Sequence, residues 1–118
     1  MITLFTMERD YPYGTLRSTN GSKTKVVLEE KGLAYQTETV SPGAVWKKLP
    51  EILAKHPLGK VPWIEDGELV LYDSTVINEY LNEKSANNPL LPADPAQRAL
   101  ARALENYADE GVLSKFLP

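Results

Sequence analysis

Residues 57–67 read PLGKVPWIEDG, and residues 69–74 read LVLYDS. Pro62 opens an apolar run in which a central strand would need its backbone N–H, so we expect a proline that starts a strand or a cis proline with a special backbone duty. The Asp66-Gly67 pair is typical of a tight hairpin turn, and Asp73-Ser74 is typical of a helix N-cap. The stretch therefore predicts a loop, a strand, a tight turn, a second strand and the start of a helix.

The same stretch also indicates a binding site. It places exposed backbone polar groups and a helix N-terminus at one end of a sheet. Backbone N–H groups at such a position can hold a small peptide-like anion. The residues indicate a ligand but do not identify it.

The rest of the chain predicts an α/β fold in which Gly32 ends the first helix at its C′ position. The Met7–Arg17 segment is expected to be an ordinary packed loop. The expected elements are a strand at 2–6, a helix at 23–31, a strand at 34–40, a short helix at 46–55 with an irregularity at Pro50, strands at 63–65 and 69–72, and a helix at 74–83. This β-α-β-α-β-β-α order is that of a thioredoxin-like domain with a mixed four-stranded sheet.

A polar linker containing Asn87-Asn88-Pro89 follows, and linkers of this composition join separately packed units. Asp94-Pro95-Ala96-Gln97 is a helix start, with a capping side chain, a proline at the first helical position and a capping-box partner. The helix is expected to run to about Leu113, and its apolar stripe needs a partner. The stripe consists of Leu100, Ala103, Leu104, Tyr107 and Ala108. The predicted parts are a first domain at 1–84, a linker at 85–94 and one extra C-terminal helix in 95–118.

Composition narrows the functions that the chain can have. Its 118 residues suffice for one hydrophobic core, and a net charge of −3 with a pI near 5.2 argues against a nucleic-acid or anionic-membrane surface. No apolar run approaches the ~20 residues that span a bilayer, and no signal-peptide pattern precedes the first strand, so we expect a cytoplasmic protein. With no Cys and one His, the chain offers no thiol and no metal constellation, so any thiol chemistry needs a thiol from a ligand.

Several motifs together resemble one family, the glutathione S-transferases, in their N-terminal thioredoxin-like domain. Gly59-Lys60-Val61-Pro62 is similar to the family's G-[KQ]-V-P segment at its cis proline, and Asp73-Ser74 is similar to its acidic-Ser pair. Supporting matches in the family's order and spacing are LEEKGL at 28–33, PEIL at 50–53, INEYL at 77–81 and LLPADP at 90–95. The resemblance implies glutathione as co-substrate, no metal, and a second all-α domain of which this chain holds the first helix.

The resemblance also implies a donor that activates the thiol at the start of the first helix. By the family's spacing this donor is the Ser18 hydroxyl, and Ser18–Lys23 is similar to the T-P-N-G-x-K motif of nu-class bacterial members, which adds Asn20. A donor and the helix dipole favour the thiolate, and lowering a thiol pKa from ~8.5 by two corresponds to roughly 2.7 kcal/mol. One alternative is that these side chains only start a helix, and another is that Tyr11 or Tyr13 donates to the sulfur.

Further contacts to glutathione follow from the same resemblance. The Val61-Pro62 backbone is expected to pair with the cysteinyl amide, and Asp73-Ser74 to bind the γ-glutamyl end. Lys60 and Lys48 are candidates for the glycyl carboxylate and backbone. The structural alternatives are a cis proline common to thioredoxin-like folds, a helix cap and two ordinary exposed lysines.

The expected function is that of a transferase in which the glutathione thiolate attacks an electrophile or a disulfide, as in detoxification. The alternative is a non-catalytic thioredoxin-fold interaction module with residual or no glutathione binding. In the family, the helix after the linker lines the subunit interface. We therefore expect a homodimer, or a piece of a longer protein, and no nucleic-acid or membrane partner.

Overall fold

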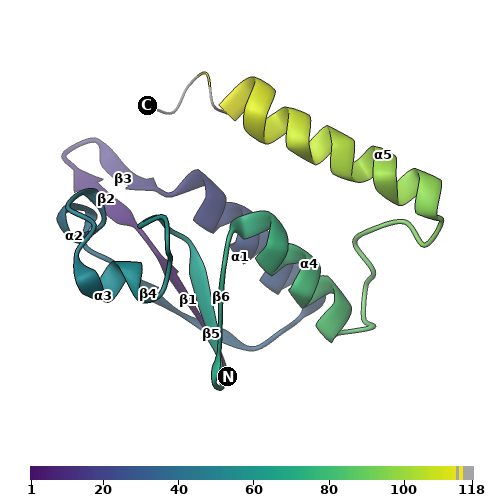
Figure 1. Ribbon diagram of the computed structural model, residues 1–118, viewed down its shortest axis with the longest axis horizontal. Coiled ribbons are helices and arrows are strands. Elements are labelled where there is room, and N and C mark those ends of the chain that lie inside the picture. The colour runs from purple at the N-terminus through teal and green to yellow at the C-terminus, as the bar shows by residue number, and fades with distance from the viewer. Residues whose placement is uncertain (114, 116–118) are drawn as a thin grey trace. The chain divides into compact units, whose positions relative to one another are not determined.

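The computed structural model describes residues 1–113 and 115 (Figure 1). The chain divides into two units, Met1–Asn88 and Pro89–Pro118. The first unit contains the sheet and the candidate site. The second contains the helix that follows the linker.

Four strands of the first unit form a mixed sheet in the order β4-β1-β5-β6. β1 is parallel to β4 and antiparallel to β5, and β5 is antiparallel to β6. The strands are β1 (Ile2–Thr6), β4 (Tyr35–Thr39), β5 (Trp63–Asp66) and β6 (Leu69–Tyr72). This sheet confirms the predicted thioredoxin-like α/β fold.

Two helices, α1 (Thr19–Lys31) and α4 (Ser74–Lys84), pack together over one face of the sheet. The core on this face consists of Ile2, Leu4, Leu28, Ile64, Ile77 and Leu81. Each such side chain contributes roughly 1.5–3 kcal/mol when fully buried. Polar contacts join the two helices as well, because Thr24 Oγ1 donates to Asn78 Oδ1 (2.9 Å) and the buried Lys31 ammonium donates to Asn82 Oδ1 (3.3 Å).

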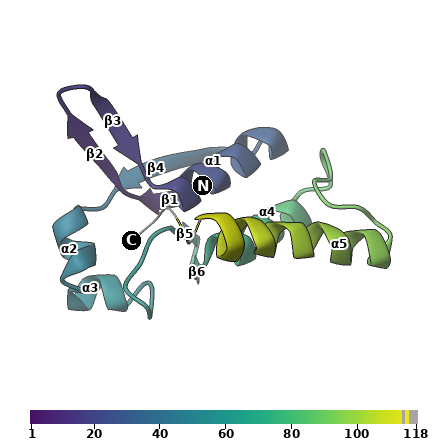
Figure 2. The same cartoon turned by 90° about the horizontal axis from the view of Figure 1, so that it is seen from above.

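The other face of the sheet is covered by two short helices, α2 (Pro42–Trp46) and α3 (Pro50–Leu53), which lie across the strands from α1 and α4 (Figures 1 and 2). Phe5 and Trp63 stack on this face with ring centroids 5.0 Å apart. The prediction of one helix at 46–55 was wrong. Pro50 has no N–H to continue a helix, but it fits the first position of a new one, where it begins α3.

The Met7–Arg17 segment is not the ordinary loop that the sequence predicted. It contains a two-stranded antiparallel hairpin of β2 (Glu8–Tyr11) and β3 (Gly14–Arg17), which projects beyond the end of β1 (Figure 2). Cross-strand contacts stabilise the hairpin, because Arg17 Nε donates to Glu8 Oε1 (3.1 Å) and Thr15 Oγ1 donates to Asp10 Oδ1 (2.7 Å).

Helix α1 begins four residues before the predicted start at Lys23. Ser18 is its N-cap, and Ser18 Oγ accepts a hydrogen bond from Gly21 N at 3.1 Å. This bond satisfies one of the N–H groups that a helix start leaves without a partner, so the helix extends back to Thr19. Its other end agrees with the prediction, since Gly32 is the C-cap with a left-handed φ of 65°.

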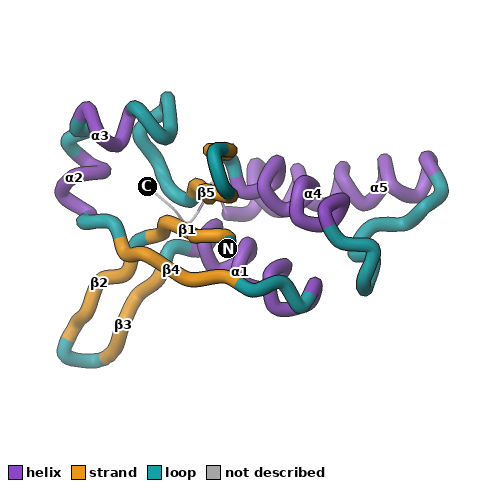
Figure 3. The backbone as a smooth tube through the Cα atoms, turned by 90° about the horizontal axis from the view of Figure 1, so that it is seen from below, coloured by secondary structure: helices purple, strands orange, loops and turns teal. Residues whose placement is uncertain are grey.

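The second unit holds α5 (Pro95–Asn106), followed by a π-helical segment, η1 (Tyr107–Leu113) (Figure 3). The predicted helix start is confirmed, because Asp94 caps α5 through its carboxylate, which accepts from Gln97 N at 3.0 Å. The prediction of one α-helix to Leu113 was wrong in its last two turns. Gly111 lies there, and glycine is a poor α-helix former.

Candidate functional site

Three loops of the first unit leave the same edge of the sheet. Phe5 near the end of β1 lies opposite Trp63 at the start of β5, and Trp63 lies opposite Tyr72 at the end of β6. The C-terminal ends of β1 and β6 and the N-terminal end of β5 therefore meet at one edge. The loops there carry the candidates Ser18, Val61-Pro62 and Asp73-Ser74.

Ser18 is fixed at the start of α1 by its backbone and its side chain. Its N–H donates to Met7 O at 3.0 Å, and its Oγ accepts from Gly21 N. Within residues 1–113 and 115 the Ser18 hydroxyl donates to no partner, so its proton is free for a ligand. Asn20 is half-buried in the first turn of the same helix.

Helix α1 approaches the end of β1 very closely. A Cβ built on Gly21 would lie 2.0 Å from Thr6 Oγ1, a distance that real Cβ atoms essentially never show. Only glycine therefore fits at this position. The close approach holds the Ser18 hydroxyl against the edge of the sheet.

The second loop contains the Val61–Pro62 bond, which is cis. Pro62 is fully buried, whereas Val61 is half-buried. No backbone hydrogen bond of Val61 is present among the described residues. The amide and carbonyl of Val61 are thus available for pairing with an extended peptide-like ligand.

His56 orders the same loop. The buried imidazole accepts a hydrogen bond at Nδ1 from Leu58 N (3.2 Å), and the His56 carbonyl accepts from Gly59 N (2.8 Å). Burial lowers the pKa of His56, and the positive charge of Lys60 lowers it further, whereas the Asp73 carboxylate opposes the shift. The neutral ring is therefore favoured, in agreement with the turn role that a histidine before Pro57 suggests.

The two lysine candidates lie near His56, since both contribute to the shift of its pKa. Lys48 Nζ donates to Leu58 O at 2.8 Å, so this ammonium already has a partner in the loop. Lys60 is exposed. Lys48 is exposed as well, so within the described residues the two lysines differ only in that the Lys60 ammonium has no hydrogen-bond partner.

Asp73 and Ser74 start α4. Asp73 Oδ1 accepts from Thr75 N (3.0 Å) and Val76 N (3.4 Å), and its φ of 74° lies in the left-handed region that few non-glycine residues occupy. Ser74 is the first helical residue and is buried. The cap leaves a negative charge at this helix start.

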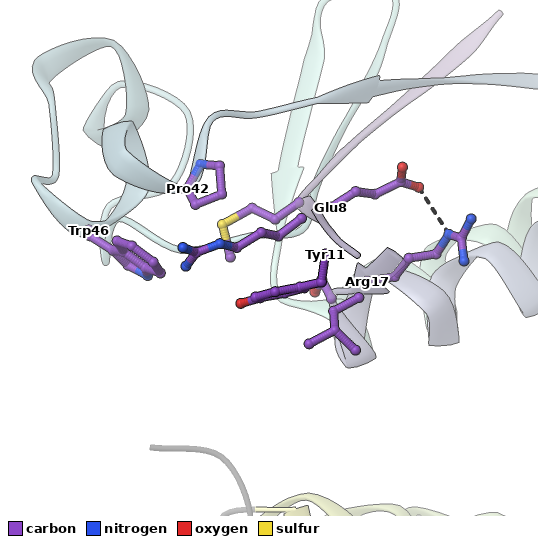
Figure 4. Close-up of a pocket in the computed structure, with 9 residues that line it drawn as sticks. Glu8, Tyr11, Arg17, Pro42 and Trp46 are labelled. Atoms are coloured by element: carbon purple, nitrogen blue, oxygen red, sulfur yellow. Dashed lines mark hydrogen bonds and ion pairs between the residues drawn. The ribbon is translucent and has the colours of Figure 1, made fainter. Parts of the chain in front are cut away.

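The hairpin adds a cavity next to Ser18, which the sequence did not predict. The cavity has a volume of about 180 Å³ and opens to solvent. Figure 4 shows the rings of Tyr11 and Trp46 beside it and the ion pair between Glu8 and Arg17. Its lining consists of Met7, Glu8, Arg9, Tyr11, Leu16, Arg17, Ser18, Pro42 and Trp46.

The structure distinguishes the two tyrosines proposed as alternative donors. Tyr11 lines the cavity with Ser18, whereas Tyr13 is 77% exposed at the hairpin turn and stacks on Tyr11 at 5.1 Å. Arg9 is a cavity residue that sequence reasoning missed. The signal was the Pro12-Tyr13 turn before Gly14, which marks two short strands and so sets which side chains share a face.

No group of three or more His, Asp or Glu side chains within the described residues could hold a metal ion. No helix in the described part of the chain is long and apolar enough to cross a bilayer.

The chain matches the family model described as "Glutathione S-transferase, N-terminal domain" over residues 17–84. A stringent starvation protein A homolog of Pasteurella multocida is 42% identical over 82 residues, which are 70% of this chain and 37% of that protein. A zeta class glutathione S-transferase of Euphorbia esula is 35% identical over 102 residues, which are 86% of this chain and 43% of that protein. The chain thus spans less than half the length of these relatives.

The chain is also similar to solved structures of glutathione transferases. The theta class glutathione S-transferase from the citrus canker pathogen Xanthomonas axonopodis pv. citri, with glutathione bound, superposes with a TM-score of 0.73 at 32% identity and covers 92% of this chain and 48% of its own. A glutathione transferase homolog from Sulfitobacter, also with bound glutathione, gives a TM-score of 0.76 over 93% of this chain and 49% of its own. At 23% identity this second match supports the fold alone.

Proposed function

Because the chain belongs to the glutathione S-transferase N-terminal domain family, we propose that it binds glutathione at this sheet edge and lowers the pKa of the bound thiol. One observation carries the proposal. The Val61 backbone makes no hydrogen bond within the described residues, and its loop precedes β5, the strand between β1 and β6. The N-termini of two helices flank this open peptide edge. They are the start of α4, which follows β6, and the start of α1, which follows the hairpin.

The Val61 N–H and C=O pair with the cysteinyl residue of glutathione in this proposal. Two backbone hydrogen bonds orient an extended peptide as a strand would be oriented. They also direct the two ends of the tripeptide to opposite sides of the loop. Pro62, which is fully buried, holds the backbone in place for this pairing.

The γ-glutamyl end binds at the start of α4. Its carboxylate accepts from the Ser74 N–H and hydroxyl, where the helix dipole favours an anion. Its ammonium lies near the Asp73 carboxylate. The glycyl carboxylate pairs with Lys60, while Lys48 mainly supports the loop through its bond to Leu58 O.

The thiol lies at the start of α1 in this arrangement. The Ser18 hydroxyl donates to the sulfur while its oxygen still accepts from Gly21 N, and Asn20 in the same turn is a second candidate donor. After the thiol proton passes to solvent, the thiolate attacks an electrophilic carbon or one sulfur of a disulfide. The new bond to sulfur forms as the leaving group departs with its electron pair.

The test is a calorimetric titration of the 118-residue chain with glutathione. We expect saturable binding, and an affinity lower by about tenfold or more in Ser74→Ala, which loses one hydrogen bond to a charged group. Ser41→Ala is the matched control, because Ser41 is a helix N-cap whose side chain makes no cap hydrogen bond. Unchanged affinity in Ser74→Ala would reject that contact, and no wild-type binding at millimolar glutathione would reject the proposal.

A second candidate function is a non-catalytic interaction module. It is favoured by the 42% identity to a protein whose name, stringent starvation protein A homolog, does not describe a transferase. In this case the fold would serve protein association. The same titration identifies a module without glutathione binding, which gives no heat, and a module with residual binding is identified by a bound thiol whose pKa stays at the free value.

We also propose that the chain is a cytoplasmic homodimer, with the apolar stripe of α5 at the subunit contact. The stripe has helical spacing at Leu100, Ala103 and Leu104, and an apolar face of this kind is normally covered. Sedimentation equilibrium tests the dimer. Leu104→Glu should shift the chain to a monomer with unchanged glutathione binding, and a wild-type monomer would reject this proposal.

A further inference from the structure

The Arg9 guanidinium lies between two aromatic rings at the cavity beside Ser18. Its Cζ is 5.2 Å from the centroid of the Tyr11 ring and 5.8 Å from the Trp46 ring. In both contacts the cationic guanidinium lies over the face of the ring, which attracts a positive charge. The N–H donors in its plane remain free to bind an anion.

Arg9 differs from the basic residues near it, Arg17 and Lys25, in having no counterion among the described residues. Arg17 pairs with Glu8 at 3.1 Å, and Lys25 lies 3.7 Å from the same carboxylate. The other acidic side chain of the hairpin, Asp10, accepts from Thr15. Within residues 1–113 and 115, Arg9 takes part in no ion pair, so the cavity carries one uncompensated positive charge.

The rest of the cavity suits an aromatic ring. Met7, Leu16 and Pro42 supply apolar surface, and Tyr11 and Trp46 supply ring faces and edges. A cavity of about 150 Å³ with an apolar lining holds benzene, so 180 Å³ is enough for one substituted ring. The Ser18 side chain belongs to the same lining, which places the ring next to the proposed sulfur position.

We infer that the hairpin cavity binds the acceptor substrate, and that this acceptor is an aromatic compound with an acidic group that pairs with Arg9. The inference rests on the proposed function for the identity of the nucleophile. Arg9 is a specificity residue here, and Trp46 and Tyr11 hold it in place. All the residues that line this acceptor site belong to the first unit, and most of them come from the hairpin and the residues next to it.

The inference is tested first by binding, without glutathione. The probes are 3,5-dinitrobenzoate and its neutral analogue 1,3-dinitrobenzene, and the readout is quenching of tryptophan fluorescence. Trp46 is 67% exposed and Trp63 is 4% exposed, so Trp46→Phe shows whether the signal arises at the cavity. We expect the anion to bind about tenfold more tightly than the neutral probe, because the anion gains one charged hydrogen bond from Arg9.

Three substitutions make the test specific. Arg9→Gln should abolish the preference for the anion. Arg9→Lys should retain part of it, because a lysine keeps the positive charge but lacks the paired N–H donors of the planar guanidinium. Lys47→Gln is the matched control, since it removes a positive charge next to Trp46 from a residue that does not line the cavity. Equal binding of the two probes by the wild type, or equal losses in Arg9→Gln and Lys47→Gln, would overturn the inference.

A glutathione titration of the same variants separates this inference from the proposed function. We expect Arg9→Gln to bind glutathione with unchanged affinity. A lower affinity would show that Arg9 belongs to the glutathione-binding part of the site, and it would overturn the inference. A wild-type chain that prefers the anionic probe but binds no glutathione would reject the proposed function, and with it the assignment of the probe site as an acceptor site.

Turnover gives the final check with 4-chloro-3,5-dinitrobenzoate and neutral 1-chloro-2,4-dinitrobenzene. In both, the glutathione sulfur bonds to the ring carbon that carries chlorine, and chloride leaves with the electron pair. Arg9→Gln should raise the KM of the anionic substrate about tenfold and leave the neutral one unchanged. Equal effects on the two substrates would contradict a charge-specific role.

Discussion

Two helices begin at the same edge of the sheet, and their N-caps differ in charge. Helix α1 is capped by the neutral Ser18 hydroxyl, which accepts one hydrogen bond from Gly21 N. Helix α4 is capped by the Asp73 carboxylate, which accepts from Thr75 N and Val76 N. The positive end of a helix dipole lies at each position, but only α4 carries a negative side chain there.

Because of this difference, the two helix starts favour ligand groups of different charge. A thiolate is favoured at the start of α1, where a neutral cap leaves the dipole uncompensated and the hydroxyl proton free. At the start of α4, the Asp73 carboxylate offsets the dipole, so a lone thiolate gains less there, whereas a zwitterionic amino-acid end can pair its ammonium with Asp73 and its carboxylate with Ser74. In the proposed function the asymmetry orients glutathione, with its sulfur toward Ser18 and its amino end toward Asp73.

The largest effect is expected from filling the contact under the α1 cap. In Gly21→Ala, the new Cβ would lie 2.0 Å from Thr6 Oγ1, so the helix start must move. Overpacking of this kind costs about 1–3 kcal/mol, which exceeds the gain of about 1 kcal/mol from replacing a helical glycine. Urea denaturation measures the loss of stability, and glutathione titration measures the expected loss of affinity.

Gly43→Ala is the control for that substitution, because its nearest neighbour, Ser41 Oγ, would be 3.8 Å away. Its effect should stay within about 0.5 kcal/mol. Combining Gly21→Ala with Thr6→Ala should recover part of the stability, since the hydroxyl in the way is removed. Additive losses in the double variant would show that the Gly21 contact with Thr6 is not the cause.

The next largest effects are expected from two substitutions of Asp73, the N-cap of α4. Asp73→Ala removes the cap, for about 1 kcal/mol, and puts an alanine at a φ of 74°, for roughly 1–2 kcal/mol more. Asp73→Asn keeps the cap and tolerates this φ, so its stability should stay within about 0.5 kcal/mol. Both should lower glutathione affinity by about fivefold, as loss of one partly exposed ion pair does. Full affinity in Asp73→Asn would contradict the assignment of the ammonium.

The loop between the two caps is expected to depend on pH through His56, the only histidine of the chain. Burial and Lys60 lower its folded pKa below the usual value, so its stabilising contribution is fully present above about pH 6.5 and is lost as pH falls through the folded pKa. Urea denaturation at pH 8 and pH 5 measures this loss. His56→Asn removes the titration while keeping an acceptor, and it should show a smaller pH dependence. The same dependence in the variant would assign it to other groups.

The smallest effect on the site is expected at the opposite edge of the sheet. Asp66 there accepts from the Tyr80 hydroxyl (2.5 Å) and pairs with Lys84 (2.9 Å), and these contacts, the Tyr80 bond first, lower the pKa of its carboxyl. This stabilisation is present above the unfolded pKa and is lost as pH falls through the folded one. Tyr80→Phe should therefore lower stability at pH 7 by about 0.5–1.5 kcal/mol, with a smaller difference in acid. Altered glutathione affinity would show that the two edges are coupled.

The elements that the sequence predicts well are those with local signals. Gly32 ends α1, Asp94 starts α5, and Asp73 starts α4, because a cap is decided by one side chain and its nearest backbone groups. The strand predicted at 2–6 is present as β1. The four-stranded sheet follows from these elements and their order.

The features that the sequence did not predict depend on contacts between distant residues or on exposed strands. The β2–β3 hairpin has mostly exposed, polar residues, so no apolar alternation marks it, and its register comes from cross-strand pairs such as Glu8 with Arg17. Arg9 becomes a cavity residue only because α2 brings Trp46 beside it. Similarly, Trp46 and Trp63 look alike in the sequence, yet the first is exposed and the second buried.

The central claim concerns the neutral cap, and the thiol pKa of bound glutathione tests it most directly. Thiolate absorbance is recorded against pH for the wild type, Ser18→Ala and Tyr11→Phe. We predict a pKa well below the free value of about 8.5 in the wild type and in Tyr11→Phe, and a return toward that value in Ser18→Ala. An unchanged thiol pKa in Ser18→Ala, or its return to the free value in Tyr11→Phe, would contradict the claim.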